Sequence, residues 1–169
     1  AKINTDGDEI SPFMAADDRT LYFASNGRPG YGSYDIYMSK RNGSSWTDWS
    51  EPINLGPEIN TTGFDAYYTL SAAADYAYMV SDRNSIGLSD LVRVKLPEEI
   101  KPDPVVLLLG RTLNAKTKEP IKTEIVFEDL STQKEIGVAV SDPKTGSYRI
   151  ALPNGKNYGI RAQVKGYLS

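Results

Sequence analysis

Adjacent carboxylates are the candidates for acid–base chemistry in this sequence, which holds no histidine and no cysteine. Thiolate nucleophiles, Cys/His zinc sites and histidine-based triads are therefore excluded. Two adjacent acidic pairs remain, Asp17 with Asp18 and Glu98 with Glu99. Neighbouring carboxyls on a turn or linker point apart and stay hydrated, so neither pair should reach the raised pKa of a general acid. We predict no catalytic residue, and we expect that the protein is not an enzyme.

The alternating residues Asn4, Asp6 and Asp8 resemble the start of a calcium-binding loop. An EF-hand loop needs glycine at its sixth position and a bidentate glutamate at its twelfth, and here Glu9 and Ala15 occupy those places. We therefore expect a hydrated loop that leads into a strand, and we predict no metal site.

The glycines Gly27, Gly30 and Gly32 follow each other in an order that differs from the dinucleotide fingerprint. They are expected between two strands, with no helix after them to hold a phosphate. We expect them to supply positive φ angles in a long hairpin loop. No cofactor is predicted.

Four aromatic residues in or beside loops are the candidates for partner binding: Tyr31, Tyr34, Trp46 and Trp49. Aromatic rings in such places can anchor a partner protein or stack on a sugar ring. The two tryptophans are more simply explained as packing for an outer strand. Tyr31 lies between two glycines that offer it little to pack against, so it is the strongest surface candidate.

Composition limits the class of protein. The chain has 169 residues, a hydrophobic fraction of 40%, a net charge of -3 and a pI near 5.1. The hydrophobic fraction is sufficient for folded cores, while the negative charge gives no electrostatic reason to bind nucleic acid or anionic membranes. The longest apolar run, in residues 105–110, is of strand length and far too short to span a membrane.

An internal repeat organises the first half. Residues 11–40 recur in weaker form as residues 67–95, with LYFASN matching AYMVSD and SYDIYMSK matching LSDLVRVK. Ser25 then matches Ser81, and Asp35 matches Asp90. A catalytic residue is needed once whereas a structural residue is needed in every repeat, so we expect these side chains to hydrogen-bond backbone within their own unit.

Turn-rich clusters divide the repeats into strands. The predicted strands of the first copy are 9–16, 20–26, 34–41 and 46–50, and those of the second are 65–72, 75–81 and 89–96. The second copy lacks a counterpart of SWTDW. We predict that residues 97–104, which contain three prolines, form a linker. Five short alternating strands without an amphipathic helix are predicted in residues 105–169, which indicates a small antiparallel sandwich.

The motifs SPFMAADDRTLYFASNGRPGYGSYDIYMSKR and SWTDWSEPINLGPEINT resemble the WD40-like (PD40) propeller repeats of OmpA-family envelope proteins of the Bacteroidetes type. GRTLNAKTKEPI and DPKTGSYRIALPNGKNYGIRAQVKGY resemble a carboxypeptidase regulatory-like domain, a transthyretin-like or Ig-like sandwich without peptidase chemistry. The resemblance implies an all-β fragment of a longer chain. Residues 1–96 would be the last two propeller blades, and the sandwich would stop before its final strands.

The same resemblance implies a non-catalytic scaffold on the periplasmic side of the bacterial outer membrane, accessory to type IX secretion or gliding. Its partners would be other envelope or secretion proteins, and peptidoglycan would be bound only by a module outside this chain. Two alternatives stay open. The chain could be a carbohydrate-binding module of a polysaccharide-processing system, or the regulatory propeller of a serine peptidase.

Overall fold

The computed structural model describes residues 2–43 and 45–164. The chain divides into two compact units, Ala1–Asp103 and Pro104–Ser169, and each is described here by itself. Within the described residues every regular element except one short 3-10 turn is a strand. The predicted all-β class is confirmed, and no helix in this part of the chain has the length and apolar character of a membrane span.

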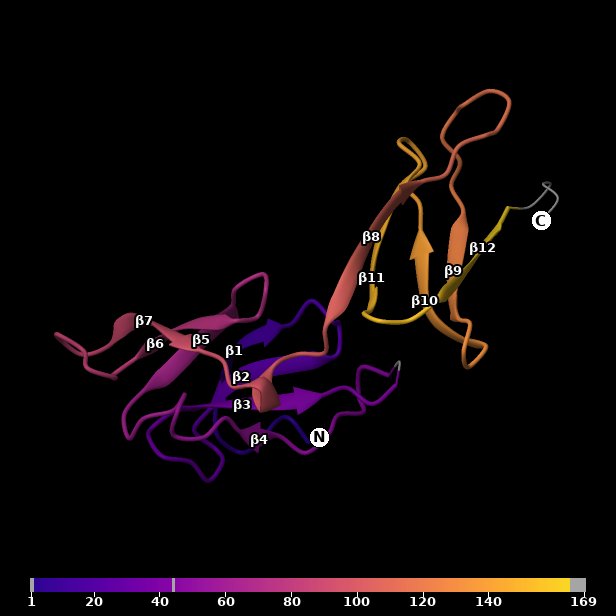
Figure 1. The fold of residues 1–169 in the computed structure, drawn as a ribbon. Helices are drawn as coiled ribbons and strands as arrows, with labels where there is room; N and C mark the ends of the chain where they lie inside the picture. The colour runs from indigo at the N-terminus through magenta and orange to yellow at the C-terminus, as the bar shows by residue number, and fades with distance from the viewer. Residues whose placement is uncertain (1, 44, 165–169) are drawn as a thin grey trace. The chain divides into compact units, whose positions relative to one another are not determined.

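The first unit contains two antiparallel sheets (Figure 1). The first sheet has the order β1-β2-β3-β4 and the second has the order β5-β6-β7. Their bounds are β1 (Glu9–Met14), β2 (Thr20–Ser25), β3 (Asp35–Lys40), β4 (Ile53–Asn54), β5 (Asp65–Leu70), β6 (Tyr76–Ser81) and β7 (Asp90–Lys95).

Apolar side chains of both sheets form one core. Tyr22 and Ile36 of the first sheet and Met79 of the second are completely buried in it. The rings of Tyr22 and Tyr68 lie 5.0 Å apart across the two sheets. The middle strand β2 is apolar at successive positions because both of its faces are covered, whereas β6 alternates between exposed and buried residues over its first four positions.

The repeat is present in the backbone conformation as well as in the amino-acid sequence. Ser25 lies opposite Asp35 in the first sheet, and Ser81 lies opposite Asp90 in the second. The first strand of each sheet has a bulge at which one residue takes a positive φ, 49° at Ser11 and 57° at Tyr67. The two copies therefore share their register and their irregularities.

The prediction of a fourth strand at residues 46–50 is wrong. The outer strand is β4, which pairs with Tyr37 and Met38. Within residues 46–50, Trp49 alone forms a bridge, which is an isolated one with Arg41. The indole N–H of Trp49 donates to the Trp46 carbonyl at 2.8 Å, so the segment between the tryptophans forms a turn instead of an extended strand.

The segment predicted as a linker packs on the first unit up to Asp103. It contains the 3-10 turn η1 (Glu98–Ile100), and the Ile100 side chain is buried. The Tyr22 hydroxyl donates to the Ile100 carbonyl at 2.7 Å. The unit boundary falls between Asp103 and Pro104, at the end of this segment.

The second unit contains two further antiparallel sheets, with the orders β10-β9-β12 and β11-β8. Their strands are β8 (Val105–Arg111), β9 (Glu124–Asp129), β10 (Lys134–Val140), β11 (Ser147–Pro153) and β12 (Tyr158–Gln163). Side chains of both sheets share one core around Phe127 and Leu152. All five strands predicted here are found, and residues 165–169 lie outside the described part of the chain.

Candidate interaction surface

The loop before β3 is held by the Asp35 carboxylate. Its Oδ2 accepts the backbone N–H of Tyr31 at 2.7 Å and that of Gly32 at 3.4 Å. In the second copy, Oδ2 of Asp90 accepts the N–H of Ile86 at 2.7 Å. The predicted structural role of the two aspartates is confirmed, since each holds its loop through its Oδ2 atom.

The matched serines have an equivalent role at the ends of the middle strands. The Ser25 hydroxyl donates to Glu9 at 2.8 Å and accepts the Gly27 N–H at 3.1 Å. The Ser81 hydroxyl donates to Asp65 at 2.5 Å and accepts the Arg83 N–H at 3.1 Å. The predicted backbone bonds of both serines are thus present, each within its own sheet.

The glycines of this loop do not have the positive φ angles that were predicted. They are needed for close approach instead. A Cβ at Gly30 would lie 1.6 Å from Oδ2 of Asp35, and one at Gly32 would lie 2.1 Å from the Gly63 carbonyl oxygen. Neighbouring protein atoms therefore leave no room for a side chain at Gly30 or Gly32.

Tyr31 and Tyr34 belong to this loop but differ in exposure. Tyr31 is 48% exposed, as expected of the strongest surface candidate. Tyr34 is half-buried, packs edge-on against Phe64 and donates its hydroxyl to Asp8 at 3.0 Å. Desolvation and the Asp8 carboxylate raise the pKa of Tyr34. Tyr31 is therefore available to a partner, whereas Tyr34 is used within the unit.

The two tryptophans also divide into one exposed and one buried residue. Trp49 is buried, as expected of a packing residue. Trp46 is 57% exposed, so the packing explanation given for both tryptophans is wrong for this one. The Arg41 guanidinium lies 4.3 Å from the centre of its ring. A cation over one face fixes the ring while leaving other parts of it free. Trp46 is thus the most prominent fixed aromatic side chain of this loop.

The structure does not bring the four candidates together. Tyr34 immediately precedes β3, whereas Trp46 and Trp49 follow its other end. A strand of six residues spans about 20 Å. Tyr31 and Trp46 therefore belong to separate surfaces at opposite ends of one strand.

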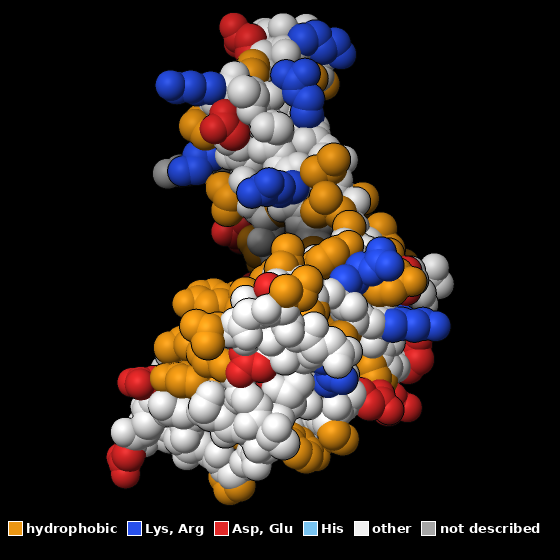
Figure 2. Space-filling model, turned by 90° about the vertical axis from the view of Figure 1, so that its left-hand side faces the viewer, with side chains coloured by type: hydrophobic (Ala, Val, Ile, Leu, Met, Phe, Trp, Pro, Cys, Tyr) orange, Lys and Arg blue, Asp and Glu red, His pale blue; other side chains and the backbone are white. Residues whose placement is uncertain are grey.

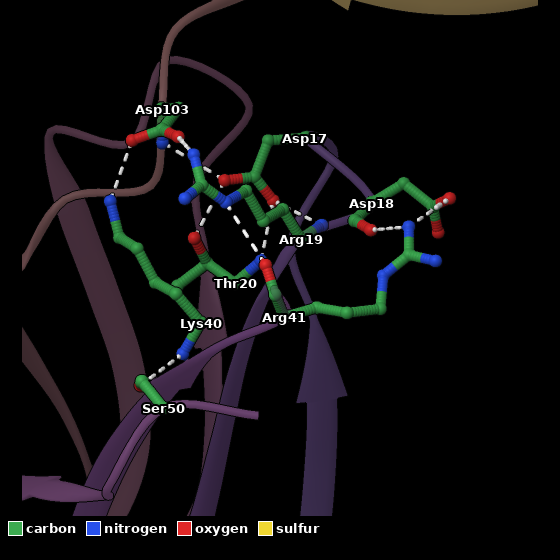
Figure 3. A network of polar contacts seen from close by, with 8 residues as sticks. All are labelled: Asp17, Asp18, Arg19, Thr20, Lys40, Arg41, Ser50 and Asp103. Carbon is green, nitrogen blue, oxygen red and sulfur yellow. Dashed lines mark hydrogen bonds and ion pairs between the residues drawn. The ribbon is translucent and has the colours of Figure 1, made fainter. Parts of the chain in front are cut away.

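A polar network lies where β2 begins and β3 ends (Figure 3). Asp103 accepts Nζ of Lys40 at 2.6 Å and the Arg19 guanidinium at 2.9 Å. The Asp17 carboxylate accepts the Thr20 hydroxyl at 2.6 Å and the Asp103 N–H at 2.9 Å. The network thus joins the first hairpin, the end of β3 and the segment before the unit boundary.

The electrostatics of this network favour the ionised form of Asp103. The hydrogen bond from Lys40 holds the pKa of Asp103 below its usual range, although partial burial acts in the other direction. On the neighbouring turn, Asp18 accepts the Arg41 guanidinium at 3.2 Å. The carboxylates of Asp17 and Asp18 serve different partners, in agreement with the expectation that adjacent residues point apart.

The segment that resembles the start of a calcium-binding loop leads into β1, as expected of a strand-entry loop. The N–H of Asp8 donates to the Asn26 side chain at 2.7 Å, and its carboxylate accepts Tyr34. Asn4 and Asp6 are exposed. Within the described residues, no three acidic side chains gather as metal ligands.

Sequence reasoning missed that this segment also belongs to the repeat, and it missed the structural role of Asn60. Residues 3–7 (INTDG) repeat residues 59–63 (INTTG), so the repeat begins earlier than position 11. Asn60, in the second copy, is buried and binds the backbone of β3: its Oδ1 accepts the Ile36 N–H at 2.7 Å, and its Nδ2 donates to the Ile36 carbonyl at 3.1 Å. The motif Ile-Asn-Thr-x-Gly, which occurs in both copies, could have revealed this extension of the repeat.

Comparison of the chain with protein-family models, with curated proteins and with solved structures gives no significant match.

Proposed function

We propose that this protein is a non-catalytic scaffold that docks partner proteins through loop aromatics at the ends of its repeat sheets. The observation that carries the proposal is the contrast between polar and aromatic side chains in the first unit. Asp17, Asp35 and Asp103 hold turns and ion pairs, while Trp46 and Tyr31 stay exposed on loops. Fixed aromatic rings are common anchors of protein interfaces.

The cellular setting of the proposal rests on the resemblance of the motifs. The order of WD40-like repeats followed by a regulatory-like sandwich resembles that of PorE, an accessory of type IX secretion. We propose a periplasmic protein at the outer membrane that contacts other envelope or secretion proteins. A module outside this chain would anchor it to peptidoglycan.

Affinity capture from a Bacteroidetes envelope extract tests this function. We expect the chain to retain identified components of the secretion apparatus, and we expect Trp46→Ala or Tyr31→Ala to reduce that capture. Tyr67→Ala is the matched control, because Tyr67 is 61% exposed but lies outside both loops. Equal capture by all four proteins, or capture of no envelope protein, would contradict docking through these rings.

Carbohydrate binding is the second candidate, and the exposed Trp46 ring favours it. An indole fixed on one side by Arg41 could stack on a sugar ring. Titration calorimetry with envelope glycans distinguishes the two functions. Binding that disappears in Trp46→Ala and persists in Tyr31→Ala would support the carbohydrate function over the protein scaffold.

A further inference from the structure

Asparagine is followed directly by glycine at three places in the sequence, where Asn26, Asn42 and Asn154 are the asparagines. Such a pair can lose ammonia without an enzyme, because glycine has no side chain that keeps its backbone nitrogen away from the preceding carboxamide. The sequence alone does not distinguish the three pairs. The structure separates them by what holds each carboxamide and each glycine nitrogen.

The first pair is kept from reacting by its neighbours. Oδ1 of Asn26 accepts the Asp8 N–H at 2.7 Å, and the Gly27 N–H donates to the Ser25 hydroxyl at 3.1 Å. A Cβ at Gly27 would lie 1.9 Å from Oγ1 of Thr5, so this glycine is tightly packed. Both reacting groups would have to leave their partners before they could meet.

The second pair is held by its asparagine only. Nδ2 of Asn42 donates to the Asp48 carboxylate at 3.2 Å, and the Asn42 N–H donates to the Asp48 carbonyl at 2.9 Å. Gly43 is exposed, and a Cβ there would have no described atom within 4 Å. The carboxamide is therefore tethered, while the glycine is open.

The third pair has its reacting groups together in an open turn between β11 and β12. Asn154 and Gly155 are both exposed, and a Cβ at Gly155 would meet no described atom within 4 Å. Oδ1 of Asn154 accepts the Gly155 N–H at 2.8 Å, so the carboxamide lies beside the nitrogen that would attack it. Groups that are already held together react faster than groups that must first meet.

The charge of the second unit favours the step that starts this reaction. Residues 104–169 contain ten Lys or Arg and six Asp or Glu, a net charge of +4, whereas the whole chain has a net charge of -3. Figure 2 shows Lys and Arg side chains spread over the face of the second unit that is in view. Positive surroundings favour the hydroxide that removes an amide proton and the anionic nitrogen that remains.

We propose that Asn154 is a site of spontaneous deamidation through a cyclic imide formed with Gly155. A base takes the Gly155 amide proton, and the nitrogen then bonds to Cγ of Asn154. The Cγ–Nδ2 bond breaks as Nδ2 takes a proton from water and leaves as ammonia. Water opens the imide at either carbonyl carbon, which leaves aspartate or isoaspartate at position 154. The net reaction consumes one water and releases one ammonia, and it does not depend on the partners considered above.

The isoaspartate product has a consequence for the second unit, because its main chain runs through the former side chain and is longer by a methylene. The Asn154 N–H donates to the Pro104 carbonyl at 2.8 Å. Two residues further on, Lys156 bonds the buried Asp129. A longer turn displaces these groups from their partners, so we expect the isoaspartate form to be less stable than the original chain.

A time course of the intact chain at pH near 8 tests the proposal. Trypsin releases residues 150–156 as one peptide and residues 20–40 as another, because it does not cleave before Pro29, and each peptide contains a single asparagine. Mass spectrometry follows the replacement of amide nitrogen by oxygen. Peptide 150–156 should convert at least about tenfold faster than peptide 20–40, whose groups must first leave their hydrogen bonds. Asn42, read by fragmentation of peptide 42–83, should convert at an intermediate rate.

Unfolding the chain separates the effect of the structure from that of the sequence. In concentrated urea the hydrogen bonds at Asn26 are lost, so its rate should rise toward that of Asn154. The rate at Asn154 should also increase with pH, because a base starts the reaction. Equal rates at the two asparagines in the folded chain, a difference that persists in urea, or a rate independent of pH would overturn the proposal.

Two variants at position 154 complete the test. Asn154→Gln keeps a carboxamide but would have to close a larger ring, so peptide 150–156 should stay unmodified while Asn26 and Asn42 react as before. Asn154→Asp carries the charge of the product on an unchanged main chain, so it should melt close to the original chain. Protein aged at pH near 8 should melt at a lower temperature than both. Aged protein that melts as the original chain does would contradict the expected effect on the turn.

Discussion

Two neighbouring tyrosines in the first core, Tyr22 and Tyr68, differ in their hydrogen bonding. Burial raises the pKa of both Tyr22 and Tyr68, so both hydroxyls stay protonated. Tyr22 donates to the Ile100 carbonyl, whereas the buried Tyr68 hydroxyl has no partner among the described residues. A buried polar group without a partner costs free energy that a bonded one does not.

Tyr22→Phe should therefore lower the free energy of unfolding by about 1 kcal/mol, while Tyr68→Phe should leave it unchanged or raise it. Urea unfolding followed by circular dichroism measures both variants under one condition. Equal losses in the two would show that the Ile100 bond contributes nothing to stability.

Asp129 makes the second unit sensitive to acid. Its buried carboxylate accepts Nζ of Lys156 at 2.7 Å and the Ser131 N–H at 2.9 Å. The bond from Lys156, followed by those from Ser131, holds the pKa of Asp129 far below its usual range. A lowered folded-state pKa stabilises the fold above the unfolded value of about 4, and that contribution is lost as the pH falls below it.

Asp129→Asn should melt at a lower temperature than the original chain at pH near 7, and the gap should narrow toward pH near 3. Thermal melts at several pH values measure this gap. Glu135→Gln is the control, because Glu135 is exposed and its variant should follow the original curve. A gap that is constant with pH would contradict the charge-based explanation.

At the scale of elements, the repeat provides its own matched glycines. Gly32 and Gly87 occupy equivalent loop positions, but only Gly32 lies against another segment. Gly32→Ala should destabilise the first unit by about 2 kcal/mol because the methyl group overlaps the Gly63 carbonyl. The free energy of unfolding of Gly87→Ala should stay within about 0.5 kcal/mol of that of the original chain. Chemical denaturation measures both, and equal effects would contradict close approach as the reason for Gly32.

The strands themselves were largely predictable, whereas the outer strand of the first sheet was not. Alternating apolar and polar residues locate a strand because its side chains point to opposite faces in turn, and turn-forming residues mark its ends. Trp46–Ser50 has the aromatic composition of a strand, yet the indole of Trp49 bonds back to the Trp46 carbonyl and forms a turn. A local side-chain bond of this kind has no period that the sequence could reveal.

At the scale of the whole molecule, the first unit depends on the segment that follows its last strand. Ile100 is buried, its carbonyl accepts Tyr22, and Asp103 bonds Lys40 and Arg19. A chain that ends at Asp103 should therefore be more stable than one that ends at Leu96. We expect a difference of about 3 kcal/mol from one buried apolar side chain and one buried hydrogen bond.

Urea unfolding of the two shortened chains measures this difference. A third chain that ends at Asp103 and carries Asp103→Asn separates the ion pairs from the buried contacts. Its free energy of unfolding should be close to that of the chain that ends at an unchanged Asp103, because partly exposed ion pairs contribute little to stability. Equal stability of the chains ending at Leu96 and at Asp103 would show that residues 97–103 act only as a connection.

The sequence alone determined the all-β class, the repeat, the absence of histidine and cysteine chemistry and the strand-bearing segments. Those properties follow from composition and from short-range periodicity. The tertiary structure decided which aromatic rings are exposed, that Tyr31 and Trp46 lie at opposite ends of β3, and that Asn60 bonds the backbone of another sheet. Exposure and contacts between distant residues depend on how the sheets pack, and local sequence carries no direct record of that packing.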